Sequence, residues 1–242
     1  MYDYMLGGKD NFAVDREAID RLSDHIPEAV PLARANRAFL QRAVRHLVAA
    51  GVRQFLDLGS GLPTQGNVHE IARDAKVVYV DHDPVVAAHA RALLEEPGRV
   101  AFVQADLMCP DEVLACPEVT GLLDLDEPVA VLLVSILHFV QEDPADMVKV
   151  LRDAVAPGSY LALTHAVPTL GRGQAEEAAK RVYKGSSTGG STGRTLAEVQ
   201  GFFGDFALVE PGLVPVAKWR PEEPRFDDPL PDYLLAGVAR KG

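Results

Sequence analysis

Short apolar segments alternate with amphipathic helical segments through the middle of the chain, and this alternation constrains the fold more than any other feature of the sequence. Each apolar segment is nearly continuous and bounded by glycine, proline or polar turn residues, a pattern typical of buried strands. The segments are VRQFLDLGSG (52–61), AKVVYVDHDP (75–84), RVAFVQADL (99–107), PVAVLLVSILHFV (128–140) and PGSYLALTHAV (157–167). Because helical segments separate them, we expect a parallel sheet covered on both faces, and right-handed crossovers would make it doubly wound.

Further elements flank this alternating region. A long helix is predicted before the first strand, within residues 1–51, and two more strands are predicted within residues 206–219 and 232–242, which makes seven strands in all. A helix is also predicted at 173–185. Thr195 and Glu198 form a plausible capping box for another helix. The sequence contains no internal repeat and no second independent core, so we expect one compact unit.

The acidic composition argues against several classes of function. The formal net charge is −11 at pH 7, and an acidic surface repels phosphate backbones, so no nucleic-acid partner is expected. No apolar run approaches the ~20 residues of a membrane-spanning helix, and the N-terminus lacks the apolar stretch of an export signal. We therefore expect a cytoplasmic protein with no membrane partner. The two cysteines, Cys109 and Cys116, lack metal-ligand spacing and are predicted to be reduced thiols, and no metal site is predicted.

The end of the first predicted strand carries a D-x-G-x-G pattern, formed by Asp57, Gly59 and Gly61. In an open parallel sheet, ligands bind at the carboxyl ends of strands near the topological switch point, and glycine allows a close approach of the backbone to a ligand. Asp81 ends the second strand 20 residues after Gly61, the usual distance for a carboxylate that binds ribose hydroxyls. Asp106 ends the third strand, where it can accept from an adenine amino group. Together these residues predict a site for an adenosine cofactor.

The glycine pattern discriminates between two such cofactors. A nicotinamide dinucleotide requires G-x-G-x-x-G, but Thr64 follows Gly59 and Gly61 at the third position. A carboxylate at Asp57 would not help to bind a pyrophosphate, whereas it could hold the ammonium of a methionine moiety. This favours S-adenosylmethionine over a nicotinamide cofactor. The alternative without any cofactor is that the glycines make turns and the aspartates cap helices.

On these residues the chain resembles the class I S-adenosylmethionine-dependent methyltransferases over about residues 52–165, and the last two strands extend the likeness because that class ends in an antiparallel pair. More narrowly, three segments resemble a family of methyltransferases whose substrate is not established: YDYMLGGKDNFAVDRE (2–17), ARANRAFLQRAV (33–44) and FLDLGSGLPTQGNVHEIA (55–72). The resemblance implies a doubly wound, Rossmann-like, mostly parallel α/β sheet of seven strands with a terminal antiparallel pair. It also implies an N-terminal helical lid or substrate segment at 1–51 and a cofactor-binding methyltransferase domain at 52–242. Pro63 departs from the class, which often has glycine there, so the detailed path of this loop is open.

The resemblance also implies roles for individual residues, each with the part of S-adenosylmethionine that it would contact. The predicted set is Asp57, Gly59, Ser60 and Gly61 around the methionine moiety, Asp81 on the ribose with His82 beside it, Asp106 and Leu107 at the adenine, and Ser135 with His138 near the sulfonium. Methyl transfer from a sulfonium needs alignment and desolvation more than a fixed catalytic group. Where the acceptor carries a proton, His138 or His165 are the candidate general bases, because they follow the fourth and fifth strands.

The opening segment is predicted to supply specificity. Lys9 and Asn11 could reach the cofactor's carboxylate or the acceptor, and Arg34 or Arg37 could meet the same carboxylate or an anionic acceptor. Two alternatives stay open for residues 1–12, a partly ordered lid or an arm packed on the sheet. We expect a methyltransferase acting on a small-molecule acceptor. A non-catalytic protein that senses S-adenosylmethionine is the alternative, and the sequence leaves the oligomeric state open.

Overall fold

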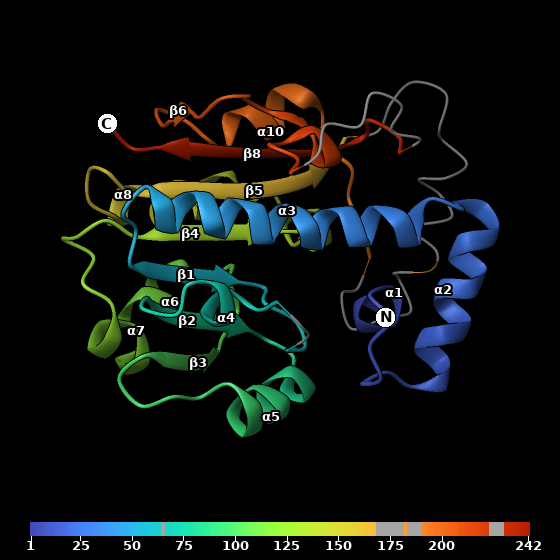
Figure 1. Ribbon diagram of the computed structural model, residues 1–242, viewed down its shortest axis with the longest axis horizontal. Coiled ribbons are helices and arrows are strands. Elements are labelled where there is room, and N and C mark those ends of the chain that lie inside the picture. Colours follow the sequence, from blue (N-terminus) through green and yellow to red (C-terminus); the bar gives the residue numbers. More distant parts are fainter. Residues whose placement is uncertain (64–65, 168–181, 183–189, 223–229) are drawn as a thin grey trace.

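The computed structural model describes residues 1–63, 66–167, 182, 190–222 and 230–242. Eight strands form one sheet in the order β3-β2-β1-β4-β5-β8-β6, and β7 also pairs with β8 (Figure 1). The strands are β1 (Gln54–Leu58), β2 (Lys76–Asp81), β3 (Val100–Gln104), β4 (Ala130–Val134), β5 (Tyr160–Ala166), β6 (Ala207–Leu208), β7 (Val214–Pro215) and β8 (Leu234–Arg240). The first five are parallel, and β8 is antiparallel to β5. The predicted doubly wound sheet with a terminal antiparallel pair is confirmed.

One predicted strand is divided in two. The segment 206–219 forms β6 and β7, which pair with opposite ends of β8, at Ala207 with Arg240 and at Val214 with Ala236. Between them, Gly212 adopts a φ of 89°, a left-handed conformation that interrupts extended backbone. The two short strands therefore occupy the single antiparallel position beyond β8 that the sequence predicts.

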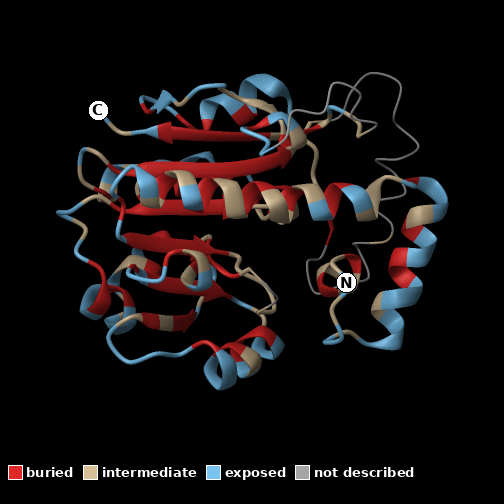
Figure 2. Ribbon diagram, in the orientation of Figure 1, coloured by how far each residue is buried: buried red, intermediate tan, exposed pale blue. Residues whose placement is uncertain are grey.

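The sheet is buried because its strands are apolar on both faces (Figure 2). Phe55 in β1 faces one core, which also contains Leu47, whereas the next residue, Leu56, faces a second core with Leu151. Successive residues of a strand point to opposite faces, so a run with no polar alternation requires cover on both sides.

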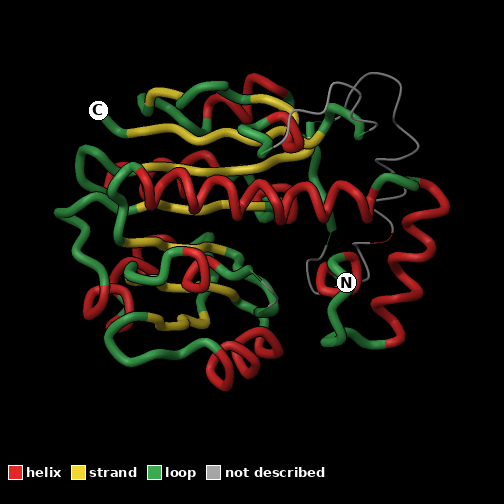
Figure 3. Tube along the Cα trace, viewed as in Figure 1, coloured by secondary structure: helices red, strands yellow, loops and turns green. Residues whose placement is uncertain are grey.

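Helices cover both faces of the sheet (Figure 3). Their bounds are α1 (Tyr2–Met5), α2 (Ala13–His25), α3 (Ala29–Ala49), α4 (Val68–Ile71), α5 (Pro84–Leu93), α6 (Pro110–Ala115), α7 (Pro117–Leu122), α8 (Ala145–Ala154) and α10 (Leu196–Gly201), with 3-10 turns η1 (Leu137–Phe139) and η2 (Val216–Lys218). In α3, Phe39 packs edge-on against Trp219, 5.2 Å between ring centroids. This contact and the bonds from Arg42 to the carbonyls of Trp219 and Val216 join the long helix to the C-terminal region.

The capping box predicted before α10 is confirmed, because the Thr195 hydroxyl accepts from the backbone of Glu198 and the Glu198 carboxylate accepts from Thr195. The helix predicted at 173–185 lies outside the described residues except for Val182. None of the helices in the described part of the chain combines the length and apolar character that a membrane span requires.

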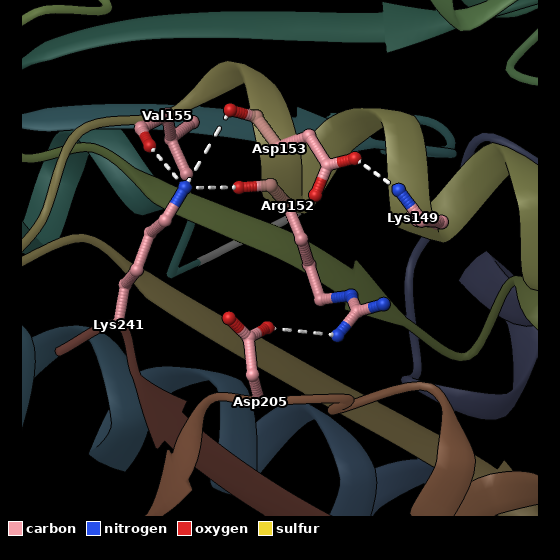
Figure 4. A network of polar contacts seen from close by, with 6 residues as sticks. All are labelled: Lys149, Arg152, Asp153, Val155, Asp205 and Lys241. Carbon is pink, nitrogen blue, oxygen red and sulfur yellow. Dashed lines mark hydrogen bonds and ion pairs between the residues drawn. The ribbon is translucent and has the colours of Figure 1, made fainter.

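The C-terminus is fastened to the end of α8 (Figure 4). Lys241 Nζ donates to the carbonyls of Arg152 and Val155, each at 2.8 Å, and lies 3.5 Å from that of Asp153. The last carbonyls of a helix have no partner within it, and a cation there also complements the helix dipole. Arg152 itself pairs with Asp205 at 3.3 Å. These contacts hold β8 in place beside β5.

The chain order places a switch point between β1 and β4. From β1 the chain moves outward to β2 and β3, and it then returns to form β4 on the other side of β1. Two neighbouring loops therefore leave the sheet in opposite directions, which opens a crevice at the carboxyl ends of these strands. In Figure 1, α1 and α2 lie beyond this edge of the sheet.

Candidate functional site

A cavity of about 750 Å³ lies at the switch point. Its floor comes from the ends of β1, β2 and β4 with the loops that follow them, and its walls come from α1, α2 and one face of α3. Of the predicted site residues, the structure brings eight together along this cavity: Arg37, Asp57, Gly59, Ser60, Gly61, Asp81, His82 and Ser135. The others lie elsewhere and are described below.

The loop after β1 requires glycine at two positions. Gly59 has a φ of 71°, and a Cβ there would lie 2.3 Å from Cγ1 of Ile136. Gly61 has a φ of 67°, and its amide donates to Oδ2 of Asp81 at 2.8 Å. Asp81 Oδ1 accepts from the amide of Asp83 at 3.0 Å. One carboxylate therefore fixes the loops that follow β1 and β2.

Asp57 lies within β1, is only 6% exposed and lines the cavity. Burial raises the pKa of its carboxyl to about 7; the nearby charge of Arg37 opposes this shift and that of Asp81 adds to it. A buried carboxyl with such a pKa carries its full charge at neutral pH only when a cationic group joins it. Asp57 therefore fits a ligand that brings an ammonium.

Two buried polar atoms beside Asp57 have no hydrogen-bond partner among the described residues, Nε of Arg37 and Oγ of Ser60. Both residues line the cavity. The guanidinium of Arg37 lies 5.8 Å from the ring centroid of Tyr2, which limits its orientation. Guanidinium and hydroxyl donors suit a carboxylate, so this corner of the cavity offers an anionic and a cationic group to a zwitterion.

A buried chain of hydrogen bonds runs from the floor of the cavity to its wall. The amide of Ser135 donates to Oγ1 of Thr164, and that hydroxyl donates to Oδ1 of Asn36, both at 2.8 Å. Asn36 Nδ2 then donates to the Tyr2 hydroxyl at 2.8 Å, and this hydroxyl donates to the carbonyl of Ala33 at 3.0 Å. Ser135 has a φ of 61°, a costly conformation for a residue with a Cβ. The chain thus connects a strained strand end to α1.

The N-terminal helices pack on α3 rather than extending into solvent. Met5, Ile19 and Leu22 are buried together with Ala33 of α3. Asn11 Nδ2 donates to the carboxylate of Asp3 and to the carbonyl of Gly8, each at 2.9 Å. Lys9 is exposed, and neither Lys9 nor Asn11 lines the cavity. Their predicted contact with the cofactor stays a prediction.

His138 and His165 form a closed cluster outside the cavity. Their rings lie 5.6 Å apart, and Arg194 Nη1 lies 3.2 Å from Nε2 of His165 and donates to the carbonyl of Leu137. The pKa of His138 is lowered to about 3 and that of His165 to about 4, mainly by burial, and the nearby charge of Arg194 contributes to both shifts. Both rings are therefore neutral at neutral pH. Neither lines the cavity, so their predicted role as general bases gains no support from this position.

Asp106 and Leu107 do not line the cavity either. Asp106 Oδ1 accepts from the amide of Met108 at 2.9 Å, and Leu107 is buried in the second core. Their predicted contacts with adenine stay predictions. Within the described ranges, no three His, Cys, Asp or Glu side chains are grouped to hold a metal ion.

Sequence reasoning missed two residues of this site, Asp3 and Asn36. Both are buried and line the cavity. The Gly7-Gly8 pair was the available signal for Asp3, because a Cβ at Gly8 would collide with the Asp3 carboxylate. For Asn36, the signal is weaker: a single amide on the apolar face of a long helix.

A doubly wound sheet with its antiparallel β8, together with an acidic and glycine-rich switch point, defines the class of S-adenosylmethionine-dependent methyltransferases. The family model described as S-adenosyl methyltransferase matches residues 1–242, and the chain belongs to this family.

Similar solved structures agree with this assignment. A protein of Thermobifida fusca YX, described as a methyltransferase, is 45% identical with a TM-score of 0.91, covering 99% of this chain and 92% of its own. A DUF574 family protein of Streptomyces avermitilis MA-4680 is 40% identical with a TM-score of 0.91, covering 100% and 95%. Magnesium protoporphyrin IX methyltransferase of Synechocystis PCC 6803, with bound SAM, shares the fold at 16% identity and a TM-score of 0.53, covering 100% and 89%. No curated protein matches the chain.

Proposed function

We propose that this chain binds S-adenosylmethionine and transfers its methyl group to a small-molecule acceptor. One observation carries the proposal. The carboxyl of Asp57 lies in the same corner of the cavity as two buried donors, Arg37 Nε and Ser60 Oγ, for which the described residues offer no hydrogen-bond partner. This set complements the ammonium and the carboxylate of a methionine moiety.

The remaining cofactor contacts follow from the same orientation. With the methionine moiety at the end of β1, Asp81 at the end of β2 would accept from ribose hydroxyls, and His82, which follows it, also lines the cavity. Gly59 and Gly61 leave room for the ligand because neither carries a Cβ. Asp106 and Leu107 remain the proposed adenine contacts, one strand further along the sheet.

When bound, S-adenosylmethionine supplies a methyl group already activated as a sulfonium. The chain's own residues then have three tasks: to hold the cofactor, to align the acceptor for in-line attack and to exclude water. The floor loops serve the first task. The α1 and α2 walls serve the others, because they cover the carboxyl edge of the sheet where the methyl group would lie.

The size and charge of the site favour a small acceptor. A cavity of about 750 Å³ is within the usual range for small-molecule sites, and the cofactor would fill a large part of it. The net charge of −11 opposes nucleic acid as the acceptor. A binding protein without turnover is the second candidate, because the two candidate histidine bases lie outside the cavity.

Calorimetric titration with S-adenosylhomocysteine tests cofactor binding. We expect Arg37→Met to weaken binding by about tenfold or more, because a charged hydrogen bond to the carboxylate is lost. Arg45→Met is the matched control, since Arg45 is an exposed arginine on the same helix, outside the cavity. Equal affinity in both variants would contradict the proposed site. Release of S-adenosylhomocysteine from S-adenosylmethionine in a screen of small acceptors then separates an enzyme from a sensor.

A further inference from the structure

We propose that Asp3 is the specificity-determining residue for the methyl acceptor and that the acceptor carries a protonated amine, which pairs with the Asp3 carboxylate. This inference rests on the proposed function, and it names the class of acceptor that the site takes. It derives from the position of Asp3, from the way its side chain is held and from the charges around it.

Asp3 lies on the wall of the cavity that the cofactor residues do not form. It belongs to α1 and lines the cavity, although only 4% of the residue is exposed. Apolar side chains also line the cavity, among them Met5, Val14 and Phe139. A buried carboxylate beside apolar lining residues can orient a ligand that is itself largely apolar.

The turn after α1 is shaped around this side chain. Asn11 Nδ2 donates to Oδ2 of Asp3 at 2.9 Å, and the amide of Gly8 donates to the carbonyl of Asp3 at 2.9 Å. A Cβ at Gly8 would lie 1.9 Å from Oδ1 of Asp3. Any residue larger than glycine would therefore displace the carboxylate. This explains the glycine at position 8, where φ is not left-handed.

The carboxylate has no cationic partner in the described part of the chain. No Lys, Arg or His nitrogen of a described residue lies within 4.0 Å of it. Two arginines of α3 make other contacts, since Arg34 donates to the carbonyl of Met5 and Arg37 lies over the ring of Tyr2. One amide hydrogen bond does not offset the desolvation of a buried charge. A cation from the cavity side would complete the pairing.

Besides Arg37 and His82 of the proposed cofactor site, two basic residues line the cavity, Arg21 and His25 of α2, and they would favour an anionic acceptor. Both are exposed, so water and salt screen their charges. Asp3 is buried, and the same charge acts more strongly where the local dielectric constant is low. The balance therefore favours an amine at Asp3.

Three ring compounds that differ in one group test this assignment: benzylamine, benzyl alcohol and benzoate. Their binding is measured by NMR titration at pH 7 with the protein saturated with S-adenosylhomocysteine. We expect benzylamine to bind about tenfold or more tightly than the other two, because only it can pair with Asp3. Asp3→Asn should remove that advantage and leave the affinity for S-adenosylhomocysteine within about twofold. Asp10→Asn is the control, with the same charge change at an exposed residue of the same segment.

Gly8→Ala gives an independent test, because it displaces the Asp3 carboxylate without removing its charge, and it should also weaken benzylamine binding. Thermal melting monitors the folding of each variant. Equal binding of the three compounds to the wild-type protein would overturn the inference even if a variant failed to fold, as would unchanged benzylamine affinity in a folded Asp3→Asn. If S-adenosylhomocysteine itself did not bind the wild-type protein, the proposed function would fail first.

Discussion

The amide of Gly61 donates a hydrogen bond of 2.8 Å to Oδ2 of Asp81, and this contact ties the loop after β1 to the end of β2. The same carboxylate accepts from Asp83 at 3.0 Å. Asp81 thus has a structural role as well as its proposed contact with ribose, and the two roles make different demands on a substitution.

Asp81→Ala removes the acceptor for both amides. We expect the free energy of unfolding to fall by about 1–3 kcal/mol and S-adenosylhomocysteine affinity to fall by roughly a hundredfold, because a ribose contact and the loop geometry are lost together. Calorimetry and urea unfolding measure the two effects. Asp74→Ala, at an exposed residue just before β2, should change neither, and an unaltered affinity in Asp81→Ala would refute the ribose assignment.

Gly59→Ala is expected to destabilise the protein by about 1–3 kcal/mol. An alanine at this position would have to adopt a φ of 71°, and its methyl group would lie 2.3 Å from Cγ1 of Ile136. Urea unfolding measures the loss. Gly121→Ala in α7 is the matched control, because a Cβ there meets nothing within 4 Å, and it should stabilise the helix by up to about 1 kcal/mol. Similar stabilities of the two variants would argue against a crowded loop.

The buried Asp57 predicts a pH dependence of both stability and binding. Burial raises its pKa to about 7 in the folded state, so the folded state holds a proton that the unfolded state has lost above pH ~4. Stability should therefore decrease as the pH rises from about 4 to 7, by a few kcal/mol in order of magnitude. Asp57→Asn should remove this decrease and stabilise the protein at neutral pH.

Cofactor binding should have the opposite slope. An ammonium pairs with ionised Asp57, so the affinity for S-adenosylhomocysteine should increase between about pH 6 and pH 8. Calorimetric titration across this range measures the slope. In Asp57→Asn the affinity should be low and lack this component, and identical slopes in the two proteins would count against Asp57 as the ammonium ligand.

The His138 and His165 cluster predicts a loss of stability in acid. Burial lowers their pKa values to about 3 and about 4, so between pH ~4 and 6.5 the unfolded state binds protons that the folded state does not. The contribution of these groups is complete above the ordinary histidine pKa and is lost as the pH falls below it. In His138→Phe, the free energy of unfolding should change less between pH 7 and pH 5. His89 in α5, which is partly buried and lies outside this cluster, provides the control, since His89→Phe should keep the wild-type slope.

The sheet could be predicted from the sequence because its strands are nearly all apolar, a pattern that only a sheet covered on both faces explains. The D-x-G-x-G loop could also be predicted, because its glycines stand where the backbone requires them. Gly59 and Gly61 both have left-handed φ values. The orientation of His138 was not readable. His138 follows Ser135, whose positive φ no local sequence pattern predicts. Its ring packs in a cluster that also contains Arg194.

The α1 and α3 side of the cavity was harder to predict than the loops after β1 and β2, because its contacts join residues that are distant in sequence. Thr164 and Asn36 are separated by 128 residues, and their bond depends on the packing of α3 across the sheet. Asp3 lies within a tyrosine-rich opening that resembled a lid or an arm. Its proposed role depends on Gly8 and Asn11, which lie against its carboxylate in the folded chain. Composition alone does not predict this arrangement.

The hydrogen-bond chain from Ser135 to Tyr2 also bears on how this enzyme could change its acceptor. These bonds join the ends of β4 and β5 to α3 and α1, so substitutions at Asn36 or Thr164 would disturb both the floor and the wall of the cavity. Val14 and Ala18 on α2 also line the cavity, yet no bond of this chain involves them. A redesign, or a natural lineage, could therefore reshape the pocket through α2 while this hydrogen-bonded frame and the proposed cofactor residues stay unchanged.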